Sequence, residues 1–244
     1  MSVIYLIRHG QANSQGEDYD LLTPRGKEQA FLLGKYMASN EDFPDKIIVG
    51  TMRRHKETAE SFLEGARSVD SARVPEIDPN FFQQDSNWNE FHSQLWKTYA
   101  GYLAGIRPDF AKSLALFSQV RLKGGIRSAA LFYKLTEEIL NFWREGSYTP
   151  EGIETYAHFE SRVQLASTKY FQPSSAERVF IFTSGTPISL TLNRMLKQDQ
   201  DMLTWMPWIW NTSLSVFRWV RGAYVPISVN FLPHIPDKKN RTLY

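Results

Sequence analysis

The chain has 244 residues, 42% of them hydrophobic and 22% charged, a composition typical of a globular protein with one large domain or one domain carrying an insertion. Its 28 basic and 26 acidic residues leave a net charge of only +2, so the charge balance gives no support for nucleic acid or a membrane surface as a partner. The absence of cysteine excludes disulfides, cysteine-ligated metal sites and thiol catalysis. The first apolar run is too short for a signal peptide or a membrane helix, so we expect a soluble, cytoplasmic protein.

The first predicted element is a strand over residues 3–7, Val-Ile-Tyr-Leu-Ile. Its residues are β-branched, aromatic or aliphatic without polar alternation, which is typical of a strand buried on both faces of a parallel sheet. The carboxyl ends of such strands meet at the crevice where α/β proteins bind ligands. Arg8, His9 and Gly10 follow directly. These residues predict a site for an anion. Arg8 is a fixed cation, His9 is a titratable nucleophile, and Gly10 allows the backbone to approach closely.

A helix is predicted next, with Thr23 as its N-cap, Pro24 at its first position and Asn40 near its end. A second short buried strand, in residues 45–51, runs straight into a helix over 52–66.

Arg53 and Arg54 stand where this second strand passes into its helix. A guanidinium group pairs bidentately with phosphate or carboxylate oxygens. Arginines at two strand ends therefore indicate an anion of that kind.

The next stretch is irregular and rich in aromatic residues, and further helices are predicted over 109–120, 127–145 and about 153–171. We expect residues 1–244 to form a single domain in which about 75–150 are an insertion that covers the site, because no Pro/Gly/Ser linker separates them.

A third strand, in residues 178–185, ends in a small polar turn, and Thr186 and Pro187 signal a following helix. Residues 213–231 alternate and turn at 221–223, which predicts a hairpin. The alternation of strands and helices predicts an α/β fold, a three-layer α/β/α sandwich with a mostly parallel central sheet and a helical insertion over the active site.

The residues at the strand ends suit phosphoryl transfer. A neutral His9 could attack phosphorus, because its ordinary pKa of about 6.5 is lowered further by neighbouring cations. A carboxylic acid must then protonate the leaving alcohol, and Glu90 lies in the region expected to cover the site.

Four segments in this order, "YLIRHGQA", "LTPRGKEQA", "TMRRHKETA" and "NEF", resemble the histidine phosphatase superfamily, also called phosphoglycerate mutase-like. The resemblance implies that His9 is the phosphorylated nucleophile and Glu90 the acid/base residue. It also implies that Arg8 and Arg54 clamp the phosphate, whereas Arg53 falls on a variable position.

The chain departs from the family at the second active-site histidine, whose position is taken by Ser184. We expect Ser184 and Gly185 to bind phosphate through a hydroxyl and the following helix N-terminus, without a positive charge. His92, two residues after Glu90, is a candidate to restore the missing cation. If position 184 is a vacant place, Ser184→His is expected to raise activity.

Other polar residues carry no motif of their own. Gln11, Asn13 and Gln15 are candidates to line the phosphate pocket, and ordinary surface roles are expected for His158 and His234.

The sequence therefore predicts a phosphomonoesterase that works through a phosphohistidine, with no metal and no cofactor. Its substrate is expected to be a small phosphorylated metabolite or a phosphoprotein. Two alternatives stay open: a phosphate- or phosphoprotein-binding protein with weakened catalysis, and a phosphomutase.

Overall fold

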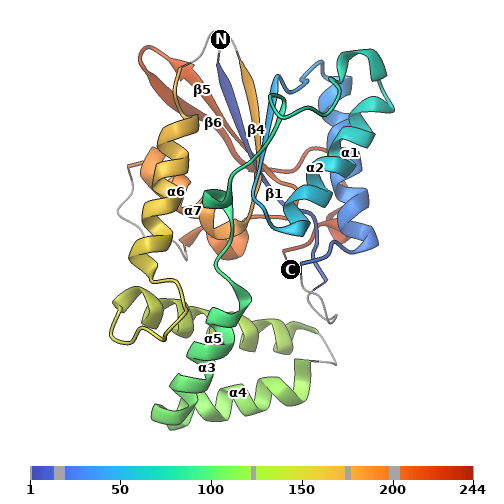
Figure 1. The fold of residues 1–244 in the computed structure, drawn as a ribbon. Helices are drawn as coiled ribbons and strands as arrows, with labels where there is room; N and C mark the ends of the chain where they lie inside the picture. Colours follow the sequence, from blue (N-terminus) through green and yellow to red (C-terminus); the bar gives the residue numbers. More distant parts are fainter. Residues whose placement is uncertain (1, 14–19, 122–124, 174–176, 198–203, 244) are drawn as a thin grey trace. The chain divides into compact units, whose positions relative to one another are not determined.

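A computed structural model describes residues 2–13, 20–121, 125–173, 177–197 and 204–243. These residues form two compact units, which we call the sheet unit (Met1–Glu90 with Val163–Tyr244) and the helical unit (Phe91–Arg162) (Figure 1). Each is described by itself.

The sheet unit contains one six-stranded sheet with the strand order β3-β2-β4-β1-β5-β6. Its strands are β1 (Val3–Arg8), β2 (Lys46–Val49), β3 (Phe82–Gln84), β4 (Arg178–Thr183), β5 (Leu214–Val220) and β6 (Ala223–Phe231). The first four strands in this order pair in parallel, and the β5–β6 hairpin joins β1 antiparallel. This confirms the predicted mostly parallel sheet and the terminal hairpin.

Strand β1 is buried on both faces, as its composition predicts. Tyr5 and Ile7 join the hydrophobic core on one side of the sheet. Ile4 and Leu6 are fully buried as well, and the alternation of side chains along a strand directs them to the other side.

Helices cover both faces of the sheet, which completes the predicted three layers (Figure 1). The helices of this unit are α1 (Pro24–Ser39), α2 (Arg53–Arg67), α7 (Gly185–Met195) and the second half of α6 (Tyr156–Tyr170). Helices α1 and α2 lie together on one face and α7 lies on the other. Thr23 caps α1 as predicted, because its side-chain oxygen accepts a hydrogen bond from the Gly26 amide at 3.0 Å.

Glycines allow α1 and α2 to pack backbone to backbone. A Cβ added at Gly34 of α1 would lie 1.9 Å from the Phe62 carbonyl oxygen, and one at Gly65 of α2 would lie 2.0 Å from the Phe31 carbonyl oxygen. The position of α2 is therefore fixed closely against α1.

The helical unit consists of α3 (Ser93–Ile106), α4 (Pro108–Val120), α5 (Gly125–Glu145) and the first half of α6. Its core is aromatic: Tyr99, Trp143 and Phe159 are fully or almost fully buried. The unit begins at Phe91 and ends at Arg162, and residues 75–90 belong to the sheet unit. The expectation that the inserted residues cover the site stays a prediction.

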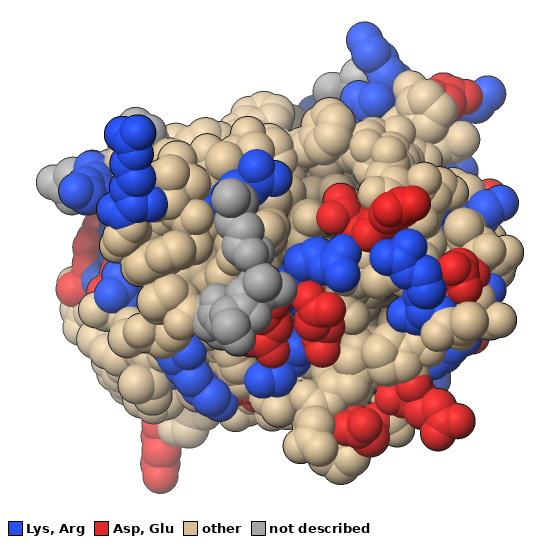
Figure 2. Space-filling model, turned by 90° about the horizontal axis from the view of Figure 1, so that it is seen from above, with Lys and Arg blue, Asp and Glu red and all other residues tan. Residues whose placement is uncertain are grey.

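Charges of both signs alternate over the face seen in Figure 2, where Lys and Arg lie beside Asp and Glu. This face therefore carries no single-sign field of the kind that attracts a polyanion. Within the described ranges, no helix combines the length and apolar content needed to cross a membrane.

Candidate active site

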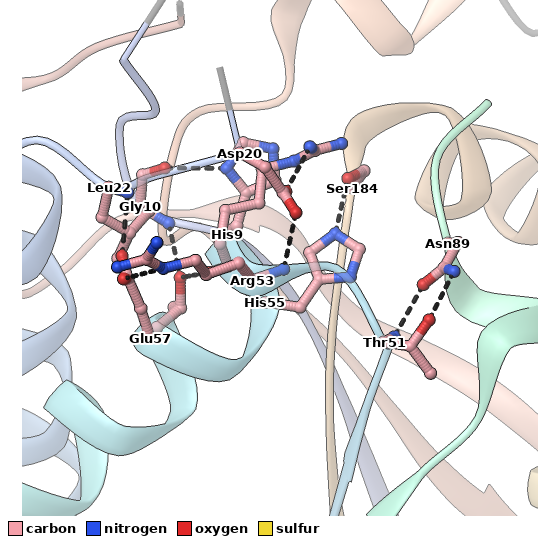
Figure 3. Close-up of polar contacts among 12 residues, drawn as sticks. His9, Gly10, Asp20, Leu22, Thr51, Arg53, His55, Glu57, Asn89 and Ser184 are labelled. Atoms are coloured by element: carbon pink, nitrogen blue, oxygen red, sulfur yellow. Dashed lines mark hydrogen bonds and ion pairs between the residues drawn. The ribbon is translucent and has the colours of Figure 1, made fainter. Parts of the chain in front are cut away.

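The candidate site lies where neighbouring parallel strands end. Because β4 lies between β2 and β1, the residues that follow these three strands meet at one edge of the sheet. They are His9 after β1, Ser184 after β4, and the start of α2 after β2 (Figure 3).

His9 is buried and held by hydrogen bonds at the end of β1. Its Nδ1 lies 2.7 Å from the Gly10 carbonyl oxygen. A carbonyl oxygen can only accept, so Nδ1 carries the proton and Nε2 keeps its lone pair. The backbone carbonyl of His9 accepts a hydrogen bond from Asn211 Nδ2 at 3.0 Å.

Burial lowers the pKa of His9 well below its usual value, and the positive charges of Arg54 and Arg8 lower it further. The ring is therefore neutral at neutral pH, and Nε2 is available as a nucleophile.

Gly10 connects the end of β1 to both neighbouring helices. A Cβ at Gly10 would lie 2.3 Å from the Gly26 carbonyl oxygen, so only glycine fits against α1. The Gly10 amide donates to Thr58 Oγ1 at 3.0 Å, and this hydroxyl donates to the Arg54 carbonyl at 2.6 Å. The nucleophile and the start of α2 are thus tied together through the backbone.

Arg8 is buried beside the first residue of α7. Its Nη1 donates a hydrogen bond to the Ile209 carbonyl. A Cβ at Gly185 would lie 3.8 Å from the Arg8 guanidinium carbon, which places this cation next to the N-terminus of α7. Both groups favour an anion.

Arg54 and Arg53 lie in opposite surroundings. The Arg54 side chain is 4% exposed, and its Nη1 lies 2.8 Å from Asp20 Oδ1. The Arg53 side chain is 59% exposed and pairs with Glu57 on the helix surface. Asp20 was not predicted from the sequence as a site residue. Its carboxylate pairs with the buried Arg54 guanidinium, and a phosphate oxygen, which is also anionic, can pair with a guanidinium in the same way.

Glu90 lies at the N-terminus of α7. Its Oε2 accepts a hydrogen bond from the Thr186 amide at 3.1 Å. The preceding residue, Asn89, accepts from the Thr51 amide and donates to the Thr51 hydroxyl, both at 2.7 Å (Figure 3). These contacts bring Glu90 to the same strand-end edge as Ser184 and Gly185.

His55 is a component of the site that the sequence did not predict. Its Nε2 lies 2.7 Å from Ser184 Oγ, and its ring centre is 5.7 Å from that of His9. The side chain is fully buried. Burial lowers its pKa well below the usual value, and the charge of Arg54 adds to the effect, so the ring is neutral.

The remaining candidates lie in several places. Gln11 Oε1 accepts a hydrogen bond from the Thr23 hydroxyl at 3.2 Å, and the Asn13 amide donates to the Leu21 carbonyl. Gln15 lies outside the described residues. His92 belongs to the helical unit, where its Nδ1 accepts from the Gln94 amide and caps α3.

The expectation for His234 is wrong. Its side chain is buried, and its Nε2 lies 2.9 Å from Thr212 Oγ1. Burial lowers its pKa to about 3. His158 is exposed on α6, as expected, and bonds to Glu154. Across the described part of the chain, no three His, Asp or Glu side chains gather in a way that could hold a metal ion.

A sequence profile of the histidine phosphatase superfamily (branch 1) matches residues 4–114 and 124–231. The chain therefore belongs to the histidine phosphatase superfamily, as its four motif segments predict.

Local similarity to curated proteins is high over a short stretch. The chain is 48% identical over 59 residues to the mitochondrial serine/threonine-protein phosphatase PGAM5 of Xenopus tropicalis, and 44% identical over 61 residues to that of Caenorhabditis elegans. These matches cover 23% and 25% of the chain but only 21% of each relative.

Solved structures share the fold over nearly the whole chain. YhfR of Bacillus stearothermophilus aligns with a TM-score of 0.63 at 21% identity, over 96% of this chain and 100% of that one. A phosphoserine phosphatase of Entamoeba histolytica, in complex with 3-phosphoglyceric acid, aligns with a TM-score of 0.58 at 17% identity, over 96% and 100% of the two chains.

Proposed function

We propose that the protein hydrolyses phosphomonoesters through a phosphohistidine on His9. The phosphoryl group binds between the guanidinium groups of Arg8 and Arg54 and the N-terminus of α7. The arginines neutralise phosphate charge, which metal ions do in other phosphoryl-transfer sites.

The reaction has two steps. In the first, His9 Nε2 forms a bond to phosphorus, the bond from phosphorus to the ester oxygen breaks, and protonated Glu90 gives its proton to the departing alcohol. In the second, water attacks phosphorus, Glu90 takes a proton from the water, and the phosphorus–nitrogen bond breaks. Inorganic phosphate leaves, and both His9 and Glu90 return to their starting states.

The observation that carries this proposal is the state of His9. The bond from Nδ1 to the Gly10 carbonyl leaves the Nε2 lone pair unprotonated, and the lowered pKa keeps the ring neutral. A buried neutral imidazole with two arginines beside it is arranged to attack an anion and not to serve as a permanent cation.

The substrate class we propose is a phosphoserine-type monoester, either free or in a protein. The family assignment supports it, as do the activities named for the similar PGAM5 proteins and for the Entamoeba histolytica enzyme.

Detection of an acid-sensitive phosphohistidine adduct tests the proposal directly. The protein is mixed with p-nitrophenyl phosphate, phosphoserine or a phosphoserine peptide, quenched within one turnover and analysed by mass spectrometry under conditions that preserve phosphohistidine. We expect an adduct on His9 that is lost in His9→Ala, together with release of phosphate. Tight phosphate binding without adduct or turnover would favour the binding-protein alternative, and transfer of the phosphoryl group to a second alcohol instead of water would favour the mutase.

A further inference from the structure

His55 and Ser184 form a buried pair beside the nucleophile. His55 comes from the first turn of α2 and Ser184 from the end of β4, and their side chains meet at 2.7 Å (Figure 3). The His55 ring centre lies 5.7 Å from that of His9, so the pair is next to the His9 side chain.

The chain leaves room for this ring at a neighbouring position. A Cβ at Gly50 would lie 2.2 Å from His55 Nδ1 and 2.8 Å from Asn89 Oδ1. The loop between β2 and α2 therefore accommodates the His55 imidazole only because residue 50 has no side chain.

The surroundings of the ring fix where its proton lies. His55 Nδ1 is buried and has no hydrogen-bond partner among the described residues. A buried N–H group without an acceptor is rarer and less favourable than a buried lone pair without a donor. The proton of the neutral ring therefore lies on Nε2, which donates to Ser184 Oγ.

This bond leaves the Ser184 hydroxyl proton available. Ser184 is the N-cap residue of α7, yet its side chain makes no capping hydrogen bond to the helix. Its oxygen accepts from His55, so its own proton can be donated to a third group. The nearby Arg8 guanidinium and the α7 N-terminus make an anion the favoured partner.

We propose that His55 is a positioning residue for phosphoryl transfer: it donates to Ser184 Oγ and thereby directs the Ser184 hydroxyl proton at the phosphoryl group as this group moves to His9. The pair supplies through a neutral hydroxyl the contact that the family resemblance assigns to a histidine at position 184. The inference rests on the proposed function, since it requires a phosphoryl group in front of His9.

The pair also changes the expectation for Ser184→His. Position 184 is not vacant, because the His55 ring already occupies the space next to the Ser184 side chain. A histidine at 184 would collide with it, so Ser184→His alone should slow the reaction. The same substitution combined with His55→Ala should recover activity, because the alanine side chain leaves the space that an imidazole at position 184 needs.

The first measurement needs no activity. Long-range ¹H–¹⁵N spectra of the intact protein, with His55 assigned by its absence in His55→Ala, should show the proton on Nε2 and a bare Nδ1. A proton on Nδ1 would overturn the proposal, whatever reaction the protein catalyses.

The second measurement follows the rate of His9 phosphorylation by p-nitrophenyl phosphate in single turnovers. We expect His55→Ala and Ser184→Ala each to slow this step by about 10²-fold, as does the loss of one positioned donor in other sites. The double variant should be no slower than the slower single variant, since both remove the same interaction. His55→Gln, which retains an N–H donor, should keep more of the rate than His55→Ala, and His55→Ala with Ser184→His should exceed His55→Ala at least tenfold.

Folding of every variant is checked by its unfolding temperature. Losses that multiply in the double variant, or an unchanged rate in a folded His55→Ala protein, would contradict the proposal. So would the absence of recovery in a folded variant that carries both His55→Ala and Ser184→His. If the wild-type protein forms no His9 adduct, the proposed function fails, whereas a wild-type adduct with a silent His55→Ala substitution rejects only the role of His55.

Discussion

At the scale of single residues, two adjacent arginines provide a matched test of the phosphate clamp. The Arg54 side chain is 4% exposed and lies beside His9, whereas that of Arg53 is 59% exposed and bonds along the helix to Glu57. Arg54→Ala should lower kcat/KM at least about tenfold, or about 1.4 kcal/mol of transition-state stabilisation, while Arg53→Ala should stay within about twofold. Steady-state kinetics with p-nitrophenyl phosphate measure both. A larger loss in Arg53→Ala would show that Arg53, and not Arg54, binds the phosphate.

The same scale explains why Asp20 lies where it does. A buried guanidinium needs an anionic or hydrogen-bonding partner, and Asp20 supplies one to Arg54 at 2.8 Å. Because Asp20 is partly exposed, water can solvate its carboxylate when a phosphate oxygen takes its place on Arg54.

At the scale of elements, the close packing of α1 against α2 fixes the position of the α2 residues at the candidate site. Gly34→Ala would place a methyl group 1.9 Å from the Phe62 carbonyl oxygen, a backbone atom, so the helices must move apart. We expect a loss of about 1–3 kcal/mol in the free energy of unfolding. Activity should fall as well, because α2 carries Arg54 and His55 to the strand ends.

The control for Gly34→Ala is Gly101→Ala in α3. A Cβ at Gly101 meets nothing within 4 Å, so alanine should stabilise that helix by up to about 1 kcal/mol. Urea unfolding of both variants gives the comparison. Equal stability of Gly34→Ala and the wild-type protein would show that the two helices can separate without loss.

At the scale of the whole molecule, three buried histidines predict sensitivity to mild acid. Burial lowers the pKa of His9 and His55 well below its usual value and that of His234 to about 3. In the unfolded chain each takes up a proton near pH 6.5, whereas in the folded protein each resists protonation. The stability is therefore full above about pH 6.5 and is lost as the pH falls below this value toward the folded pKa values.

The slope of this loss is large. Each histidine contributes up to about 1.4 kcal/mol per pH unit in that window, so three contribute about 4 kcal/mol per pH unit. One pH unit then removes a substantial part of the roughly 5–15 kcal/mol typical of a folded protein. Urea unfolding at about pH 7.5, 6.5 and 5.5 measures it. His234→Gln should reduce the slope by about a third, because one of the three buried rings is then absent. A stability that is flat between these pH values would contradict the buried, neutral state of the three rings.

Most of the sheet could be predicted from the sequence, because a strand buried on both faces is apolar along its whole length and the hairpin turn has its own local signal. It missed β3, whose three residues are too few to show a period. It also missed α3, where buried Leu95, Tyr99 and Leu103 are separated by further aromatic residues that hide the helical stripe.

The sequence also predicted the main residues that lie at the candidate site. Arg8, His9 and Arg54 follow directly from the ends of β1 and β2, so the local order of strand, turn and helix is enough to place them at one edge of the sheet. Glu90 could be named from its motif, but its hydrogen bond to the α7 N-terminus became visible only in the folded chain.

The surroundings of His55 and His234 became known only from the folded chain. His55 bonds to a residue 129 positions away, and His234 to one 22 positions away, and nothing in the residues around either histidine indicates its partner. Burial, the proton position on an imidazole and the charge that surrounds it depend on which distant segments pack together. A local pattern describes only a short stretch of the chain. These properties arise only when β2 and β4 pair in the sheet and the segment around His234 packs against Thr212.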